Sequence, residues 1–163
     1  MAKQKIPSTQ AIRELRTHQI DFTLYSYRYE KKAGVAVAAV AADALGVDEH
    51  QVVKTLVMMD DRSEPFLVLM HGDKHISTKA LARELDVKKV RPCDQEEAKR
   101  YSGYLVGGIS PFGTKRKMKV YVEASILTLP KMYINAGKRG LLAAMAPHVL
   151  TRVLDAIPVN VAV

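Results

Sequence analysis

The sequence predicts one domain of the mixed α/β or α+β class, built on a single sheet or a small barrel. Its 163 residues are close to the ~150 typical of one domain. Candidate strands and helices interleave irregularly, in segments too short for a regular series of βαβ units, so a doubly wound fold is disfavoured. With 48% hydrophobic and 26% charged residues, the composition argues against disorder, collagen and a coiled coil.

Helix and strand signals alternate along the first half of the chain. Ser8 or Thr9 can cap a helix with apolar residues at helical spacing, and an alanine-rich segment ends at the helix-stopping Gly46. Alternating side chains predict a strand with an aromatic face, and two apolar runs joined by a polar turn predict a hairpin. In order, these elements cover residues 11–16 (helix), 22–29 (strand), 35–45 (helix), and 52–59 with 65–70 (hairpin).

The second half begins with two well-signalled helices. Ser77 can cap the first, and Asp94 with Glu97 forms a capping box at the start of the second. A glycine-rich stretch follows, and a closing helix has a proline at an early position. The predicted elements are residues 78–85 (helix), 87–91 (strand), 95–101 (helix), 119–122 and 132–135 (strands), 137–140 (turn) and 147–154 (helix).

Two groups of residues resemble known sites without matching them. His71 and His75 flank an Asp, but in a turn they share no helical face and no third ligand cluster is visible, so a polar turn is favoured over a metal site. The segment from Gly108 to Lys115 has Walker A glycine spacing, yet its Thr precedes its Lys and Pro111 lacks an N–H donor. We therefore predict no metal, cofactor or triphosphate hydrolysis.

The sequence shows no activated nucleophile. Cys93 has no neighbour that would make a thiolate, and no serine lies in a Gly-x-Ser-x-Gly elbow. Lys54 is the unusual residue, because it interrupts an apolar strand. Its side chain either reaches solvent at a sheet edge or points into a pocket, and the sequence favours neither.

The expected compartment is the cytoplasm. A single cysteine cannot form an internal disulfide, which fits a reducing environment. The longest apolar run, residues 35–42, is far shorter than the ~20 residues of a membrane span, and residues 1–10 lack a signal peptide's apolar segment. No membrane partner is expected.

Positive charge is concentrated in one part of the chain. With 25 Lys and Arg against 17 Asp and Glu, the net charge is +8, and residues 113–139 contribute +6 of it through 7 basic residues and 1 acidic residue. Such a charge suits nucleic acid, an anionic membrane surface or acidic substrates. A solvated basic face is the alternative explanation.

Three motifs in order resemble one known family. They are Val53-Lys-Thr-Leu-Val57, Gly103-Tyr-Leu-Val-Gly-Gly-Ile-Ser-Pro-Phe-Gly113 and Tyr133-Ile-Asn-Ala-Gly-Lys-Arg-Gly140. The chain resembles the YbaK/EbsC family of aminoacyl-tRNA deacylases over nearly its whole length. The long glycine motif is most similar to the bacterial YbaK proteins, which clear Cys-tRNA(Pro) and are related to the editing domain of some prolyl-tRNA synthetases.

The resemblance implies a single editing domain over residues 1–163, a compact mixed barrel surrounded by helices. It implies a catalytic centre at Lys54, Gly107, Gly108 and Ser110. It implies substrate contacts at Tyr27, Ile109, Pro111, Phe112, Asn135, Ala136 and Gly137. The basic stretch then predicts tRNA contacts at Lys115, Arg116, Lys117, Lys119, Lys138 and Arg139. The implied partners are the acceptor end of tRNA, tRNA(Pro) in particular, and prolyl-tRNA synthetase.

The implied reaction uses the substrate's own cysteine thiol, which attacks the aminoacyl ester and expels the tRNA. Such chemistry needs positioning more than acid–base groups. The enzyme would also act on Cys-tRNA(Cys). Two alternatives stay open: a deacylase of the same fold that activates water against another misacylated tRNA such as Ala-tRNA(Pro), and a tRNA- or synthetase-binding module without turnover.

Three departures from the family's pattern bear on the pocket. Ala136 stands where the family usually has glycine, and its methyl group is expected to narrow the pocket. Leu142 stands where an Asp often occurs and removes a polar partner. Residues 29–34 lack the family's usual His-Asp stretch.

Overall fold

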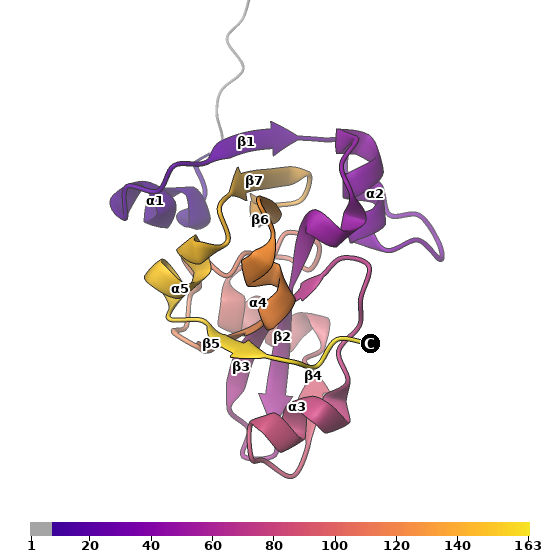
Figure 1. Cartoon of the computed structure of the whole chain (residues 1–163), viewed down its shortest axis with the longest axis vertical. Helices are drawn as coiled ribbons and strands as arrows, with labels where there is room; N and C mark the ends of the chain where they lie inside the picture. Colours follow the sequence, from indigo (N-terminus) through magenta and orange to yellow (C-terminus); the bar gives the residue numbers. More distant parts are fainter. Residues whose placement is uncertain (1–7) are drawn as a thin grey trace, which may run out of the picture.

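The computed structural model describes residues 8–163, so most of the amino-terminal segment used above to exclude a signal peptide lies outside it. Among the described residues, eight strands join in one mixed sheet with helices packed around it (Figure 1). The helices are α1 (Gln10–Thr17), α2 (Val37–Leu45), α3 (Thr78–Glu84), α4 (Gln95–Ser102) and α5 (His148–Leu154), with short 3-10 helices η1 (Glu49–Gln51) and η2 (Ala124–Thr128). The strands are β1 (Thr23–Ser26), β2 (Val52–Asp60), β3 (Pro65–His71), β4 (Val90–Pro92), β5 (Lys119–Glu123), β6 (Met132–Lys138), β7 (Leu141–Met145) and β8 (Ile157–Val159).

The strands follow the order β1-β7-β6-β2-β3-β5-β8, and β4 pairs separately with β2. Pairings β1–β7, β6–β7, β2–β3 and β2–β4 are antiparallel, whereas β2–β6, β3–β5 and β5–β8 are parallel. The predicted mixed sheet is therefore confirmed. No helix of the described chain is long and apolar enough to cross a membrane.

The capping signals place the helices correctly. Thr9 accepts a hydrogen bond from the amide of Ile12, and the Asp94–Glu97 capping box is formed in both directions. Gly46 ends α2 in the left-handed conformation, which glycine adopts without steric cost. The hairpin of β2 and β3 is confirmed as well.

One edge of β2 is only partly covered. At its start β2 pairs with β6 through Val52 and Val53, and at its end it pairs with β4 from Met58 onward. Between these points a single bond from the Cys93 amide reaches the Val57 carbonyl, at 2.9 Å. Residues 54–56 thus have no strand partner on this edge within the described chain, and the sheet opens there.

Small side chains let α2 lie close to this opening. Ala38, Ala41 and Ala42 are buried against the start of β2 and against β6 and β7, in a cluster with Val52 and Leu142. Because alanine projects little from a helix, the backbone of α2 approaches the sheet closely. The larger core on the other side of the sheet is centred on α1, α5 and the glycine-rich loop.

The sequence analysis missed β7 and β8 and misplaced three boundaries. Strand β4 begins at Val90 rather than at residue 87. Strand β1 ends at Ser26 rather than continuing to residue 29, and the Tyr27 amide instead donates to the Gly140 carbonyl at 2.9 Å. Strand β6 runs on to Lys138 with a register shift after Asn135, so the predicted turn at residues 137–140 is shorter.

Candidate active site

A cavity of about 290 Å³ lies at the uncovered edge of β2. Its wall combines β2, the start of α2, Ala98 of α4 with Pro92 and Cys93 before that helix, the glycine-rich loop, and single residues of β6 and β7. Of the residues predicted to form the site, it contains Tyr27, Lys54, Gly107, Ile109 and Asn135. The remaining wall residues are mostly apolar: Ala36, Val37, Ala38, Ala41, Val52, Val53, Thr55, Leu56, Val57, Pro92, Cys93, Ala98, Val106 and Leu142.

Lys54 lies in the cavity wall, half-buried on the open part of β2. Burial lowers the pKa of its ammonium group, while the nearby carboxylates of Glu49 and Asp73 act in the opposite direction. In partly apolar surroundings a lysine ammonium group acts on a nearby charge more strongly than it would in water. It is suited to stabilising negative charge on a bound ligand.

Asn135 holds the glycine-rich loop in place. Its amide nitrogen donates to the carbonyls of Gly107 and Lys138, each at 3.2 Å, and its oxygen accepts from the amides of Gly137 (2.7 Å) and Lys138 (3.1 Å). Arg139 adds a bond to the Val106 carbonyl at 2.9 Å. The loop and the turn after β6 therefore form one rigid wall.

Gly108 brings these two backbones together. A Cβ atom built on Gly108 would lie 2.8 Å from the Arg139 nitrogen and 3.0 Å from the Lys138 carbonyl carbon. Only glycine fits there, because both neighbours are backbone atoms. The Gly108 amide donates to the Leu105 carbonyl at 2.8 Å, so it is not free for a substrate.

The far end of the loop is fixed to the core. The Tyr104 hydroxyl donates to the Phe112 carbonyl at 2.6 Å, and the Gly113 amide donates to the Glu14 carboxylate of α1. The Ser110 hydroxyl accepts from the Phe112 amide at 3.3 Å and is fully buried. These contacts stabilise the loop from inside.

Several predicted site residues lie outside the cavity wall. Gly108 and Ser110 shape the loop, and Pro111 and Phe112 pack beneath it. Fewer of the predicted substrate-contacting residues therefore line the cavity. Of the predicted amide donors, Gly107 and Ile109 lie in the wall. The predicted residues absent from the wall are Gly108, Ser110, Pro111, Phe112, Ala136 and Gly137.

Burial disfavours the charged forms of the titratable groups in the wall. Burial raises the pKa of the Cys93 thiol to about 11, and it raises the pKa of the Tyr27 hydroxyl, with a smaller effect from Tyr29. Within residues 8–163 the wall contains no Asp, Glu or His. The wall thus contains one lysine and the loop residues Gly107 and Ile109, but no carboxylate or imidazole that could act as a general base.

A family model for the aminoacyl-tRNA editing domain matches residues 32–153. The chain belongs to this family. The match spans the cavity wall from Ala36 to Leu142.

Known relatives of this editing domain include free-standing proteins and parts of synthetases. EbsC of Enterococcus faecalis, assigned by its name as a Cys-tRNA(Pro)/Cys-tRNA(Cys) deacylase, is 27% identical over 151 residues, which are 92% of this chain and 91% of EbsC. The proline–tRNA ligase of Limosilactobacillus reuteri is 29% identical over 117 residues, 68% of this chain but 20% of the ligase.

Two solved structures share the fold of this editing domain. The hypothetical protein APE2540 has a TM-score of 0.85 at 24% identity, over 95% of this chain and 100% of that one. A protein described as a trans-editing enzyme for prolyl-tRNA synthetase has a TM-score of 0.78 at 23% identity, over 96% of this chain and 98% of that one. The architecture expected from the resemblance is thus confirmed.

Only one of the two single-residue departures from the family pattern reaches the cavity. Ala136 is 1% exposed, packs into the main core and does not line the wall, so the expected narrowing of the pocket was wrong. Leu142 does line the wall. The editing domain has an apolar surface at that point.

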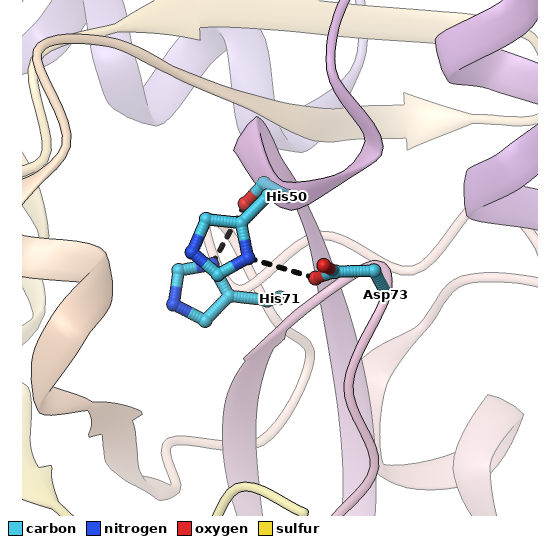
Figure 2. A group of neighbouring side chains, drawn as sticks. All are labelled: His50, His71 and Asp73. Carbon is cyan, nitrogen blue, oxygen red and sulfur yellow. Dashed lines mark hydrogen bonds and ion pairs between the residues drawn. The ribbon is translucent and has the colours of Figure 1, made fainter.

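Two histidines and an aspartate cluster at the end of β3, where His71 pairs with Val53 of β2 (Figure 2). His50 of η1 stacks on His71 of β3 with ring centres 3.7 Å apart and planes 7° apart, and its Nδ1 lies 2.9 Å from the Asp73 carboxylate. The expectation that no third ligand joins His71 and Asp73 was therefore wrong. His75 lies apart, its backbone paired with Val163.

The geometry of this cluster does not suit a metal ion. The three candidate ligand atoms lie within 4.8 Å of one another, but lone pairs in two parallel, stacked ring planes do not converge on one point. Both His71 nitrogens are also engaged, Nδ1 with the His50 carbonyl and Nε2 with the Ser125 hydroxyl, each at 2.7 Å. The cluster thereby links η1, β3 and η2.

All six predicted tRNA-contacting residues are exposed, in two groups. Lys138 and Arg139 lie at the loop rim, where Arg139 stacks on Tyr29 at 5.2 Å. Residues 115–119 run beside the end of α4, because the amides of Lys115 and Arg116 donate to the carbonyls of Ser102 and Tyr101, each at 3.0 Å.

The sequence analysis missed an aromatic component of the second group. The guanidinium groups of Arg100 and Arg116 lie 5.1 and 5.5 Å from the Tyr101 ring centre. Ala98, less than one helical turn away on α4, lines the cavity. The sequence signal that could have predicted this aromatic component was the pair Arg100-Tyr101, near the end of a helix that begins with a capping box.

Proposed function

We propose that this editing domain deacylates tRNA mischarged with cysteine, Cys-tRNA(Pro) in particular and Cys-tRNA(Cys) as well. Membership of the editing family and the naming of EbsC support the substrate class. One structural observation carries the mechanism: the cavity wall contains Lys54 and the loop residues Gly107 and Ile109, but no Asp, Glu or His among the described wall residues. The attacking group is then supplied by the substrate.

The proposed step balances without a cofactor. The cysteine thiolate of the substrate attacks its own ester carbonyl, a carbon–sulfur bond forms, and the bond to the terminal ribose oxygen breaks. The proton released by the thiol ends on that ribose hydroxyl, and the cyclic thioester is then hydrolysed by water. A protein thiol is not required, in accord with the raised pKa of Cys93, about 11.

The residues of the wall stabilise the charge that develops in this step. The amides of Gly107 and Ile109 have no hydrogen-bond partner in the part of the chain that the structure describes, so they can donate to the carbonyl oxygen as it becomes negative. Lys54 can neutralise charge on the same oxygen or on the leaving ribose. Fixed donors of this kind act best where water is excluded.

A charging panel tests the proposal. The purified protein should release cysteine from tRNA(Pro) faster than it releases alanine or serine, because a thiol ionises near neutral pH and a hydroxyl does not. Release is measured with radiolabelled amino acids, and a chelator should leave the rates unchanged. Equal rates for all three amino acids would exclude thiol assistance, and no release of any of them would exclude the deacylase.

The two basic groups are proposed to bind the acceptor end of the tRNA. Phosphate contacts position a nucleic acid without reading its bases, which suits a substrate defined by its amino acid. The basic group at the end of α4 begins beside the cavity, and Tyr101 adds a stacking surface. The match to part of prolyl-tRNA synthetases supports action beside that enzyme. The proposed compartment is the cytoplasm.

Neutralising Lys115, Arg116 and Lys117 together should weaken tRNA binding and flatten its salt dependence. The slope of log K against log salt should change by about 2–3, since each lost phosphate contact removes roughly one released counterion. Filter binding over a salt series measures this slope. The triple variant of Lys79, Lys88 and Lys89, basic residues on or near α3, is the matched control and should retain it. An unchanged slope in the first variant would exclude this surface.

A further inference from the structure

The glycine-rich loop makes a tight turn at the cavity wall. The Gly108 amide donates to the Leu105 carbonyl at 2.8 Å, which closes a turn over residues 105–108. Of the two central residues, Val106 and Gly107, only Gly107 has a positive φ, +93°. A positive φ at the third position alone is typical of a type II turn, in which glycine is favoured at that position.

The peptide unit between Val106 and Gly107 can take two orientations in such a turn. Type I and type II turns differ in ψ of the second residue and in φ of the third, each by about 150–170°, so this one peptide unit turns over while its neighbours stay in place. Glycine adopts either sign of φ at little steric cost. The orientation of this peptide unit therefore depends on its contacts with other residues.

Arg139 holds the carbonyl side of the peptide unit. Its Nε donates to the Val106 carbonyl at 2.9 Å, and its guanidinium group lies over the Tyr29 ring, 5.2 Å from the ring centre. Tyr29 also lies against Gly107, since a Cβ atom built on that glycine would be 2.7 Å from the Tyr29 hydroxyl oxygen. The arginine and the tyrosine thus contact the same peptide unit.

The amide of this peptide unit is directed away from Arg139. In a planar trans peptide, the C=O and N–H bonds point in opposite directions, and no peptide bond of the described chain is cis. Val106 and Gly107 line the cavity, whereas Arg139 and Tyr29 do not. With these two side chains on the outer side, the Gly107 N–H, which has no partner within residues 8–163, is left for the cavity side.

We propose that Arg139 is a positioning residue, which keeps the Val106–Gly107 peptide in the orientation that directs the Gly107 N–H toward the ester carbonyl of the substrate. The inference rests on the proposed function. Without the Nε bond, the peptide can turn over and direct the Val106 carbonyl oxygen to the cavity. That oxygen would repel the negative charge that develops during the reaction, whereas an N–H group stabilises it. Arg139 therefore affects the chemical step as well as the phosphate contact proposed above.

The experiment separates these two roles of Arg139. Single-turnover release of cysteine from Cys-tRNA(Pro) is measured at saturating protein, and binding of uncharged tRNA(Pro) is measured over a salt series. Arg139→Lys keeps the positive charge but lacks the planar guanidinium group, whose Nε donates while its face lies on Tyr29. It should retain the salt slope and lower the single-turnover rate about tenfold, the effect of one lost hydrogen bond from a charged group. Arg139→Met should show the same loss of rate and reduce the slope by about 1.

Lys131→Met is the matched control. Lys131 and Arg139 directly precede and follow β6, and both are exposed. The Lys131 ammonium group also lies over a tyrosine, 5.5 Å from the Tyr133 ring centre. Because Lys131 lies outside the cavity wall, this variant should retain the wild-type rate and salt slope.

Two results would overturn the inference. One is a wild-type rate in Arg139→Lys, which would leave positive charge as the only contribution of Arg139. The other is an equal loss of rate in Lys131→Met, which would show that removing any cation stacked on a tyrosine has this effect. A wild type inactive on every charged tRNA would instead reject the proposed function, so the two failures are distinguishable.

Discussion

Replacing Lys54 with alanine should lower kcat/KM for Cys-tRNA(Pro) by about 100-fold or more, the usual effect of removing a group that stabilises an oxyanion. Lys54 is half-buried in the cavity wall, and no other lysine or arginine lies in that wall within the described chain. Single-turnover release of cysteine from charged tRNA measures the loss. The substitution should change the free energy of unfolding little, because burial already disfavours the charged form of this ammonium group.

Two comparisons separate this effect from a general loss of positive charge. Lys79→Ala removes an exposed lysine of α3 and should retain full activity. Since burial lowers the pKa of Lys54, wild-type activity should decline at a more alkaline pH that is still below 10.5, as the ammonium loses its proton. An active Lys54→Ala variant would remove this residue from the mechanism.

Gly108→Ala should reduce activity by about 100-fold although it does not touch the substrate, because misplaced catalytic groups lose rate steeply. The added methyl would meet backbone atoms of Arg139 and Lys138 at 2.8 and 3.0 Å, so the loop and the turn after β6 must separate. The amides of Gly107 and Ile109 would move with the loop. The overpacking should also lower the free energy of unfolding by about 1–3 kcal/mol.

Gly46→Ala is the matched control for this substitution. A methyl group at Gly46 meets nothing within 4 Å, but its φ of +66° is unfavourable for alanine. It should lower stability by about 1 kcal/mol and leave kcat/KM unchanged. Thermal melts and deacylation rates of the two variants test whether the close backbone approach at Gly108 is needed for activity. A Gly108→Ala variant as active as Gly46→Ala would show that the loop position is not critical.

Local signals account for the part of the fold that the sequence predicts well. Helices α3 and α4 were placed within a residue or two because Ser77 and Asp94 cap them through contacts three residues away. Strand β7 was missed because Leu141–Met145 is buried throughout and contains two alanines, so it has neither the alternation nor the composition of a strand. Its conformation is imposed by β1 and β6, which pair with it on both edges.

The difference between local sequence signals and long-range strand pairing also matters for the candidate site. Lys54 and Gly107 were identified because they belong to recognisable motifs, and both lie in the cavity wall. The uncovered part of β2 was not predicted, because it results from the register in which β4 and β6 pair with that strand. The stacking of His50 on His71 was not predicted, because η1 and β3 are separated in the sequence. Sequence motifs thus identified two residues of the cavity wall, while long-range pairing determined which neighbours surround them.

The most direct test of the account replaces only the sulfur of the substrate. Cysteinyl-tRNA(Pro) is compared with tRNA(Pro) carrying 2-aminobutyrate, which has a methyl group in place of the thiol. If the substrate's thiol is the nucleophile, the wild-type protein should release cysteine at least about 100-fold faster than 2-aminobutyrate, since this cavity supplies no base to activate water. Release of both at similar rates would contradict the account and indicate attack by water.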